Sequence, residues 1–174
     1  KLIRAKTAIK QAIVGLREEG LIQLEGWAEA LQNTTPQTPT LVQRLDEADQ
    51  FYYLVPMEND HRVTTVIACV NARYGNYEEA ILASKGASLL TPSLTRQQIL
   101  GLVIGKRFVL PGNKGIIMMR KESATLSPTL VWKPCRESFS PFLPFYVVTS
   151  GTNYLYVRID GQVFTNLHDT ERGI

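Results

Sequence analysis

The sequence contains few of the residue types that build most catalytic and metal centres. Its 174 residues include only two cysteines and two histidines. No group of His, Cys, Asp and Glu has the spacing of a zinc or calcium site. No glycine-rich loop joins a strand to a helix in the way that phosphate binding requires. We therefore expect no metal and no cofactor, and we assign no catalytic residue.

Long apolar runs are also missing. No run approaches the ~20 apolar residues that a helix needs to cross a bilayer, so we expect no membrane span. Hydrophobic residues make up 44% of the chain and charged residues 20%, which is typical of a folded globular protein. At this length the chain forms one domain or two small ones.

Acidic residues are absent between Glu79 and Glu122. Residues 1–90 carry a formal charge of −2, whereas residues 91–174 carry +5. This surplus of positive charge favours either a solvated basic face or an anionic partner that binds the stretch 85–121. Phe108 is the only aromatic residue in the stretch, which argues against nucleic acid because base stacking uses several aromatic rings. The cations of the stretch are Lys85, Arg96, Lys106, Arg107, Lys114, Arg120 and Lys121.

One pattern occurs twice along the chain. The segment Pro39-Thr40-Leu41-Val42 recurs as Pro128-Thr129-Leu130-Val131. Each copy precedes an aromatic run typical of a strand, residues 51–55 and residues 145–148, and then a β-rich run that ends in a glycine turn. Two copies of one supersecondary unit explain this order. We predict two related units, residues 1–90 and residues 91–174.

The first unit opens with a helical pattern. Apolar residues recur at spacings of three and four, which gathers them on one helix face, and Gly20 is placed to end the helix. A second short helix is predicted within residues 21–31. The residues of the first apolar face are Ala5, Ile9, Ala12, Ile13 and Leu16.

Strands follow in the first unit. Their pattern predicts strands over residues 40–45, 50–55 and 63–70, with the last of them central in a sheet. Pro56 is expected to limit the second strand. Residues 78–83 suit a brief helical stretch.

The second unit repeats the order. A helix is predicted over residues 94–104, with Thr95 as N-cap and Gln98 completing a capping box. A hairpin is expected across residues 108–119, and strands over 128–132, 145–148 and 153–159 with an edge strand over 162–167. The predicted fold class is α+β, two related units in which a helix packs on an antiparallel β-sheet.

The chain resembles the PepSY-like domains, a family of small cystatin-like modules, often found in tandem, in which a helix covers an antiparallel sheet. The resemblance rests on the strand pair at residues 52–55 and 63–70 and on its closure, Asn71-Ala72-Arg73-Tyr74-Gly75. Asn71 stands where the family has an aspartate, and the second unit closes with the looser Arg158-Ile159-Asp160-Gly161. The resemblance implies a non-enzymatic binding or inhibitory module, often peptidase-associated and extracytoplasmic, with no catalytic residues.

The two cysteines suggest an alternative function. Cys135 with His61 or His168 would form the dyad of a small thiol-dependent hydrolase. A cysteine nucleophile needs a lowered pKa, and no helix begins at Cys135 to provide it. Cys69 lies in an apolar strand, where a buried free thiol is expected. We therefore favour a protein without enzymatic activity.

Residues 132–145 form the most distinctive stretch, because prolines, phenylalanines and an arginine are interleaved there. Two interpretations stay open. The loop is rigid and its aromatic rings cap the core, or it recognises a protein partner through aromatic and arginine anchors. The candidate partner-binding residues are Trp132, Arg136, Phe139, Phe142 and Phe145.

Overall fold

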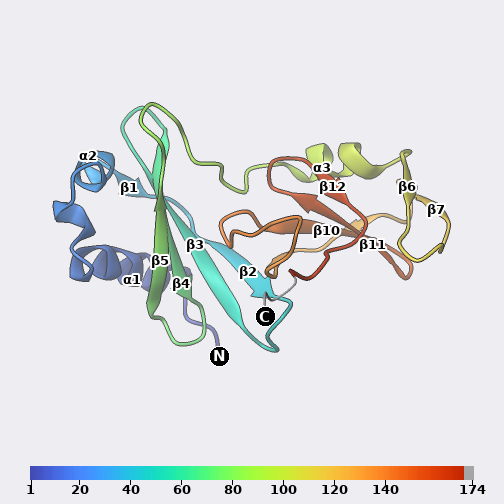
Figure 1. Ribbon diagram of the computed structural model, residues 1–174, viewed down its shortest axis with the longest axis horizontal. Helices are drawn as coiled ribbons and strands as arrows, with labels where there is room; N and C mark the ends of the chain where they lie inside the picture. Colours follow the sequence, from blue (N-terminus) through green and yellow to red (C-terminus); the bar gives the residue numbers. More distant parts are fainter. Residues whose placement is uncertain (171–174) are drawn as a thin grey trace. The chain divides into compact units, whose positions relative to one another are not determined.

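The computed structural model describes residues 1–170. The chain forms two compact units, Lys1–Thr91 and Pro92–Ile174, and the last four residues of the second, 171–174, lie outside the described residues. Each unit combines at least one helix with antiparallel strands (Figure 1), which confirms the α+β fold class. Among residues 1–170 no helix is both long and apolar enough to span a membrane.

Unit 1 begins with three helical segments. They are α1 (Ala5–Glu18), the 3₁₀ turn η1 (Leu21–Gln23) and α2 (Trp27–Leu31). Gly20 follows α1 in the left-handed region with φ of 69°, which confirms it as the residue after the helix end. The predicted second helix over 21–31 is therefore a 3₁₀ turn followed by a short α-helix.

Helix α1 covers one face of the unit 1 sheet (Figure 1). Its buried residues Ala8, Ala12 and Leu16 pack against apolar residues of the sheet such as Val55 and Val66. The predicted face was wrong at Ile13, which is 39% exposed. Residues spaced by four form a straight stripe along the helix, and Ile13 lies about 100° around the helix from Ala12.

Five strands form the sheet of unit 1. They are β1 (Thr35–Pro36), β2 (Thr40–Arg44), β3 (Phe51–Glu58), β4 (Thr64–Asn71) and β5 (Tyr77–Leu82). β2, β3, β4 and β5 pair in this order, all antiparallel, and β1 pairs with the far end of β3. The predicted central position of the strand over 63–70 is confirmed, because β4 lies between β3 and β5.

Two local predictions for unit 1 were wrong. Strand β3 does not stop at Pro56 but continues to Glu58. The carbonyl of Pro56 accepts a hydrogen bond from Gln37 N, so its missing N–H faces the β1 side and leaves the ladder to β4 intact. Residues 78–82 lie in strand β5 instead of a helix, because six residues make a marginal helix whereas the edge of β4 supplies backbone partners.

Unit 2 contains one helix and seven strands within its described part. They are α3 (Arg96–Val103), β6 (Arg107–Val109), β7 (Ile116–Met118), β8 (Thr125–Leu126), β9 (Leu130–Trp132), β10 (Phe145–Ser150), β11 (Asn153–Arg158) and β12 (Val163–Phe164). The predicted hairpin and strands are confirmed, although the edge strand over 162–167 shrinks to two residues. The capping box of α3 is confirmed as well: Thr95 Oγ1 accepts from Gln98 N at 3.1 Å, and Gln98 Oε1 accepts from Thr95 N at 2.9 Å.

The strands of unit 2 pair in the same order as those of unit 1. β9, β10, β11 and β12 form an antiparallel meander, and β8 pairs with the far end of β10, as β1 does with β3. Within the repeated segment, Leu41 and Val42 lie in β2, and Leu130 and Val131 lie in β9. Val42 pairs with Tyr52, and its counterpart Val131 pairs with Phe145.

Candidate functional site

The loop between β9 and β10, residues 133–144, begins with a tight turn. Cys135 N donates to Ser138 O at 3.3 Å, and Ser138 N donates back to Cys135 O at 3.2 Å. The Ser138 side chain is buried, and its Oγ lies 2.7 Å from Leu143 O, so this hydroxyl ties the start of the loop to its end. A second turn follows, in which Leu143 N donates to Ser140 O. The loop is thus held by its own hydrogen bonds.

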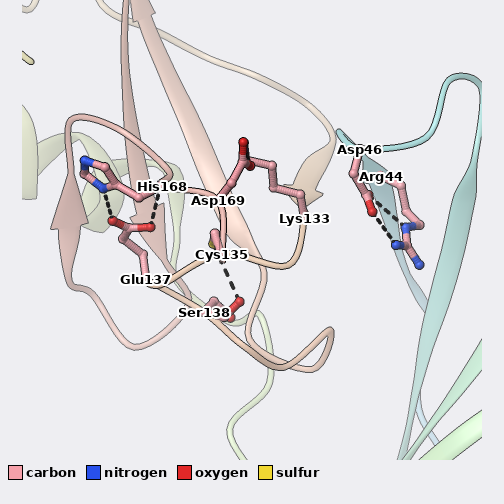
Figure 2. Close-up of polar contacts among 8 residues, drawn as sticks. All are labelled: Arg44, Asp46, Lys133, Cys135, Glu137, Ser138, His168 and Asp169. Atoms are coloured by element: carbon pink, nitrogen blue, oxygen red, sulfur yellow. Dashed lines mark hydrogen bonds and ion pairs between the residues drawn. The ribbon is translucent and has the colours of Figure 1, made fainter. Parts of the chain in front are cut away.

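A clamp joins this loop to the segment after β12. Arg136 N donates to His168 O at 2.9 Å, and His168 N donates to Glu137 Oε2 at 2.9 Å. The imidazole Nδ1 of His168 lies 2.5 Å from Glu137 Oε1, and Lys133 Nζ lies 2.6 Å from Asp169 Oδ1 (Figure 2). The sequence alone predicts none of these contacts of Glu137 and His168.

The carboxylate of Glu137 makes two contacts with His168, one to its backbone N–H and one to its imidazole. Burial by itself would raise the pKa of Glu137, but hydrogen bonds from the His168 side chain and from backbone N–H groups outweigh burial and hold this pKa below its ordinary value. The side chain of Glu137 is 10% exposed, whereas that of His168 is 56% exposed. Glu137 is therefore an ionised structural group in the folded protein at neutral pH.

Arg158 fixes the same loop from β11. Its Nη1 donates to Glu137 O at 2.5 Å, while Nε and Nη2 both donate to the carboxylate of Asp160. The guanidinium also lies over the Phe164 ring, 5.4 Å from its centre. The hydrogen bond from Arg158 is the main reason that the pKa of Asp160 lies below its ordinary value.

The five candidate partner-binding residues fall into two groups. Trp132, Phe142 and Phe145 are buried, and the Phe145 ring makes edge-to-face contacts with other aromatic rings of unit 2. Arg136 and Phe139 are exposed. Phe139 is 74% exposed, the largest value among the apolar side chains of unit 2 in the described part. The loop itself thus carries one buried ring, that of Phe142, and one exposed ring, that of Phe139.

The thiols lie where they are poor nucleophiles. Cys135 is fully buried and Cys69 is 2% exposed. Burial raises the pKa of both thiols, so the reactive thiolate is disfavoured. Cys135 Sγ is 3.6 Å from Ser138 O, and Cys69 Sγ is 3.6 Å from Glu78 Oε2, which fits donation by neutral thiols. Both cysteines are free.

The histidines have structural surroundings. His61 lies in the turn between β3 and β4, where the Asn59 side chain accepts from His61 N and Val63 N. His168 contacts Glu137 as described above. Within residues 1–170, no group of three or more His, Cys, Asp or Glu is arranged to hold a metal ion.

The clamp could not be found from the sequence. Glu137 and His168 are 31 residues apart, and no motif links them. Arg158 and Asp160 do carry a local signal, because a strand that ends in Arg-x-Asp-Gly places both side chains at one turn. That signal predicts a turn and not a contact with the loop.

Comparisons of the chain with protein-family models, with curated proteins and with solved structures found no match. The PepSY-like resemblance therefore stays a prediction.

Proposed function

We propose that this protein is a non-enzymatic binding or regulatory module, and that the β9–β10 loop recognises a protein partner through Phe139. The observation that carries the proposal is the exposure of Phe139 on a loop that is otherwise fixed. An aromatic ring that is 74% exposed gains free energy when a partner covers it. The hydrogen bonds of Ser138 and the clamp at Glu137 order the loop before binding, so little entropy is lost on association.

The arrangement of aromatic residues on the loop also supports a recognition role. Phe142 and Phe145 are buried and anchor the loop to the unit 2 core, whereas Phe139 points its ring away from that core. Aromatic anchors of this kind carry much of the binding energy at protein interfaces. Arg136 is exposed on the same loop.

We further propose that the two units are related copies of one module. Their shared strand order supports this, as does the closing turn. Ala72 N donates to Phe51 O in unit 1, and Ile159 N donates to Pro144 O at the corresponding point of unit 2. The order of helix and antiparallel meander is that expected of a tandem PepSY-like protein, and a peptidase partner or an inhibitory role is proposed on that resemblance alone.

The buried thiols give no support to the alternative of a thiol-dependent hydrolase. An anionic partner of the basic stretch 85–121 is compatible with the proposal, because the whole of that stretch lies outside the β9–β10 loop.

The test is quantitative capture of partners by three variants of the full chain. Phe139→Ala is expected to lose the proteins enriched by the wild type, while its urea unfolding midpoint changes little because the ring is exposed. Tyr154→Ala, which removes another ring that is 54% exposed, is the matched control and should keep the partners. A panel of purified peptidases, assayed with the wild type and Phe139→Ala, examines the inhibitory role.

Phe145→Ala separates recognition from packing. This ring is fully buried, so its truncation should cost about 3–5 kcal/mol of stability. If Phe139→Ala retains every partner, the loop is not the recognition site. If it destabilises the protein as much as Phe145→Ala does, the ring has a packing role instead.

A further inference from the structure

Strands β6 and β7 form a separate two-stranded ribbon in unit 2, beyond the end of α3 (Figure 1). Arg107 pairs with Met118, Phe108 with Ile117 and Val109 with Ile116. Side chains alternate between the two faces of a strand, so Phe108 and Ile117 share one face and the other four paired residues share the opposite face. Ile117 is 9% exposed, which marks its face as the inner one.

Apart from Arg107, the residues on the outer face of the ribbon are aliphatic, and they are exposed. Val109 is 72% exposed, Ile116 63% and Met118 49%. An exposed apolar cluster on a short ribbon costs solubility and stabilises nothing in the unit, so it indicates a contact surface. Unit 1 has η1 and α2 between its first helix and its first strand, whereas unit 2 has this ribbon there. The meander therefore does not require the ribbon.

Cations surround the aliphatic face. Exposed lysines and arginines lie at both ends of the two strands, and no acidic residue occurs between Glu79 and Glu122. In the part of the chain that the structure describes, no ion pair neutralises them. These cations are Lys106, Arg107, Lys114, Arg120 and Lys121.

A hollow of about 680 Å³ lies at the base of the ribbon. Leu100, Gly101 and Ile104 give it an apolar part, and Arg96, Gln97 and Lys121 give it a polar part. Gly105 N donates to Met119 O at 3.0 Å and fixes the end of α3 against the end of the ribbon. Two cations and an amide beside apolar side chains suit an anionic group attached to an aliphatic chain.

We propose that the β6–β7 ribbon docks on an anionic lipid bilayer. The aliphatic side chains enter the interface, the surrounding cations contact lipid headgroups, and the hollow accepts one headgroup. An apolar face bordered by lysine and arginine is the combination that binds such interfaces. This is a peripheral contact and requires no membrane-spanning segment.

Other occupants fit the ribbon less well. Nucleic acid would stack on aromatic rings, and Phe108 is the only one on the ribbon and lies partly buried on the inner face. A second copy would bring cations of the same sign together. A protein partner forms a stable interface by burying about 800 Å² on each side, which is more than three aliphatic side chains supply, whereas shallow insertion into a bilayer needs only a few such side chains.

The first test is co-sedimentation of the full chain with vesicles. We expect binding to vesicles of phosphatidylcholine with 30% phosphatidylglycerol and weaker binding to pure phosphatidylcholine. Binding should be lost as the salt concentration rises, because salt screens the attraction between the cations and the anionic headgroups. Arg107→Gln with Lys114→Gln should weaken binding about 25-fold, since each cation near an anionic surface contributes about fivefold. Val109→Asp with Ile116→Asp should weaken it more than tenfold, while Tyr154→Asp on β11 should leave it unchanged.

The second test reports insertion directly. Cys69 and Cys135 are buried, so a cysteine introduced by Ile116→Cys is selectively labelled with an environment-sensitive fluorophore. Anionic vesicles should shift its emission to the blue, and the same label introduced by Tyr154→Cys should not respond. The proposal is overturned if the protein binds phosphatidylcholine vesicles as tightly as it binds vesicles that contain phosphatidylglycerol. It is also overturned if the variant with Val109→Asp and Ile116→Asp binds as the wild type does, or if the protein binds single-stranded DNA more tightly than vesicles. A monomer–dimer equilibrium that the aspartate variant abolishes would assign the ribbon to self-association instead.

Discussion

Gly15 and Gly101 provide the sharpest test of the packing around the helix inside each unit, because the same substitution should have opposite effects on stability at the two positions. Both glycines lie inside helices, Gly15 in α1 and Gly101 in α3. Alanine is favoured over glycine in a helix interior by about 1 kcal/mol. Helix propensity alone therefore predicts that Gly→Ala stabilises the protein at both sites.

The surroundings of Gly15 reverse that sign. A Cβ there would overlap Cβ and Cγ of Tyr77 in β5. Rotation of the Tyr77 ring cannot relieve the overlap, since its Cβ is fixed by the backbone, which pairs with Val70. Helix α1 has to move off the sheet, and overpacking of this kind costs about 1–3 kcal/mol. With the cost at the upper end of that range and the propensity gain subtracted, we expect Gly15→Ala to destabilise unit 1 by about 2 kcal/mol.

Gly101 has open space where a Cβ would be added, and its φ is not positive. Gly101→Ala should therefore stabilise unit 2 by about 0.5–1 kcal/mol. For a unit of this size each kcal/mol moves the melting temperature by about 4–8 °C.

Urea unfolding followed by tryptophan fluorescence measures both effects, because Trp27 lies in unit 1 and Trp132 in unit 2. Trp132→Phe and Trp27→Phe backgrounds isolate each signal, with parent and alanine variant compared in the same background. An increase in the urea midpoint of Gly15→Ala would refute the close approach of α1 and β5. A decrease for Gly101→Ala would refute the open surroundings of α3.

Two further predictions follow from the capping box and from the carboxylates. Thr95→Ala removes the side-chain acceptor for Gln98 N and should cost about 1 kcal/mol in urea unfolding, whereas Thr95→Ser should retain most of the stability; equal losses would contradict the capping role. The pKa values of Glu137 and Asp160 are lowered in the folded protein, so their contribution to stability is present above the unfolded value of about 4 and is lost as pH falls through the lower folded values. The free energy of unfolding, measured as a function of pH, should show this decline, and Glu137→Gln should make the decline smaller. If the unfolding free energy of that variant falls with pH as steeply as that of the wild type, Glu137 does not contribute to the decline.

Local sequence signals predicted those features that depend on neighbouring residues. The capping box of α3, Gly20 after α1 and the hairpin at residues 108–119 were all found, because each is formed by residues a few positions apart. The predicted helix at residues 78–83 was wrong for the opposite reason. Strand β5 exists because β4 offers backbone partners along its edge, and a six-residue segment has no strong preference of its own.

For the candidate site as well, some features were indicated by the sequence and others depend on the fold. The sequence indicated that the stretch 132–145 is distinctive, and its aromatic residues were identified as candidates for either packing or recognition. The sequence could not assign Phe142 and Phe145 to the core and Phe139 to the surface, since all three are phenylalanines in the same stretch. The clamp of Glu137 and His168 and the aliphatic outer face of the ribbon likewise depend on residues that folding brings together.

The sequence by itself determined the α+β class, the order of most elements and the basic character of the second half, because periodicity, caps and charge are local properties of the chain. Only the tertiary structure decided that Cys135 is buried, which phenylalanine is exposed and which face of the β6–β7 ribbon meets solvent. Burial and side-chain contacts depend on partners distant in sequence, and strand pairing selects those partners. The exposed Phe139 and the exposed ribbon face became candidates for binding only once that pairing was in place.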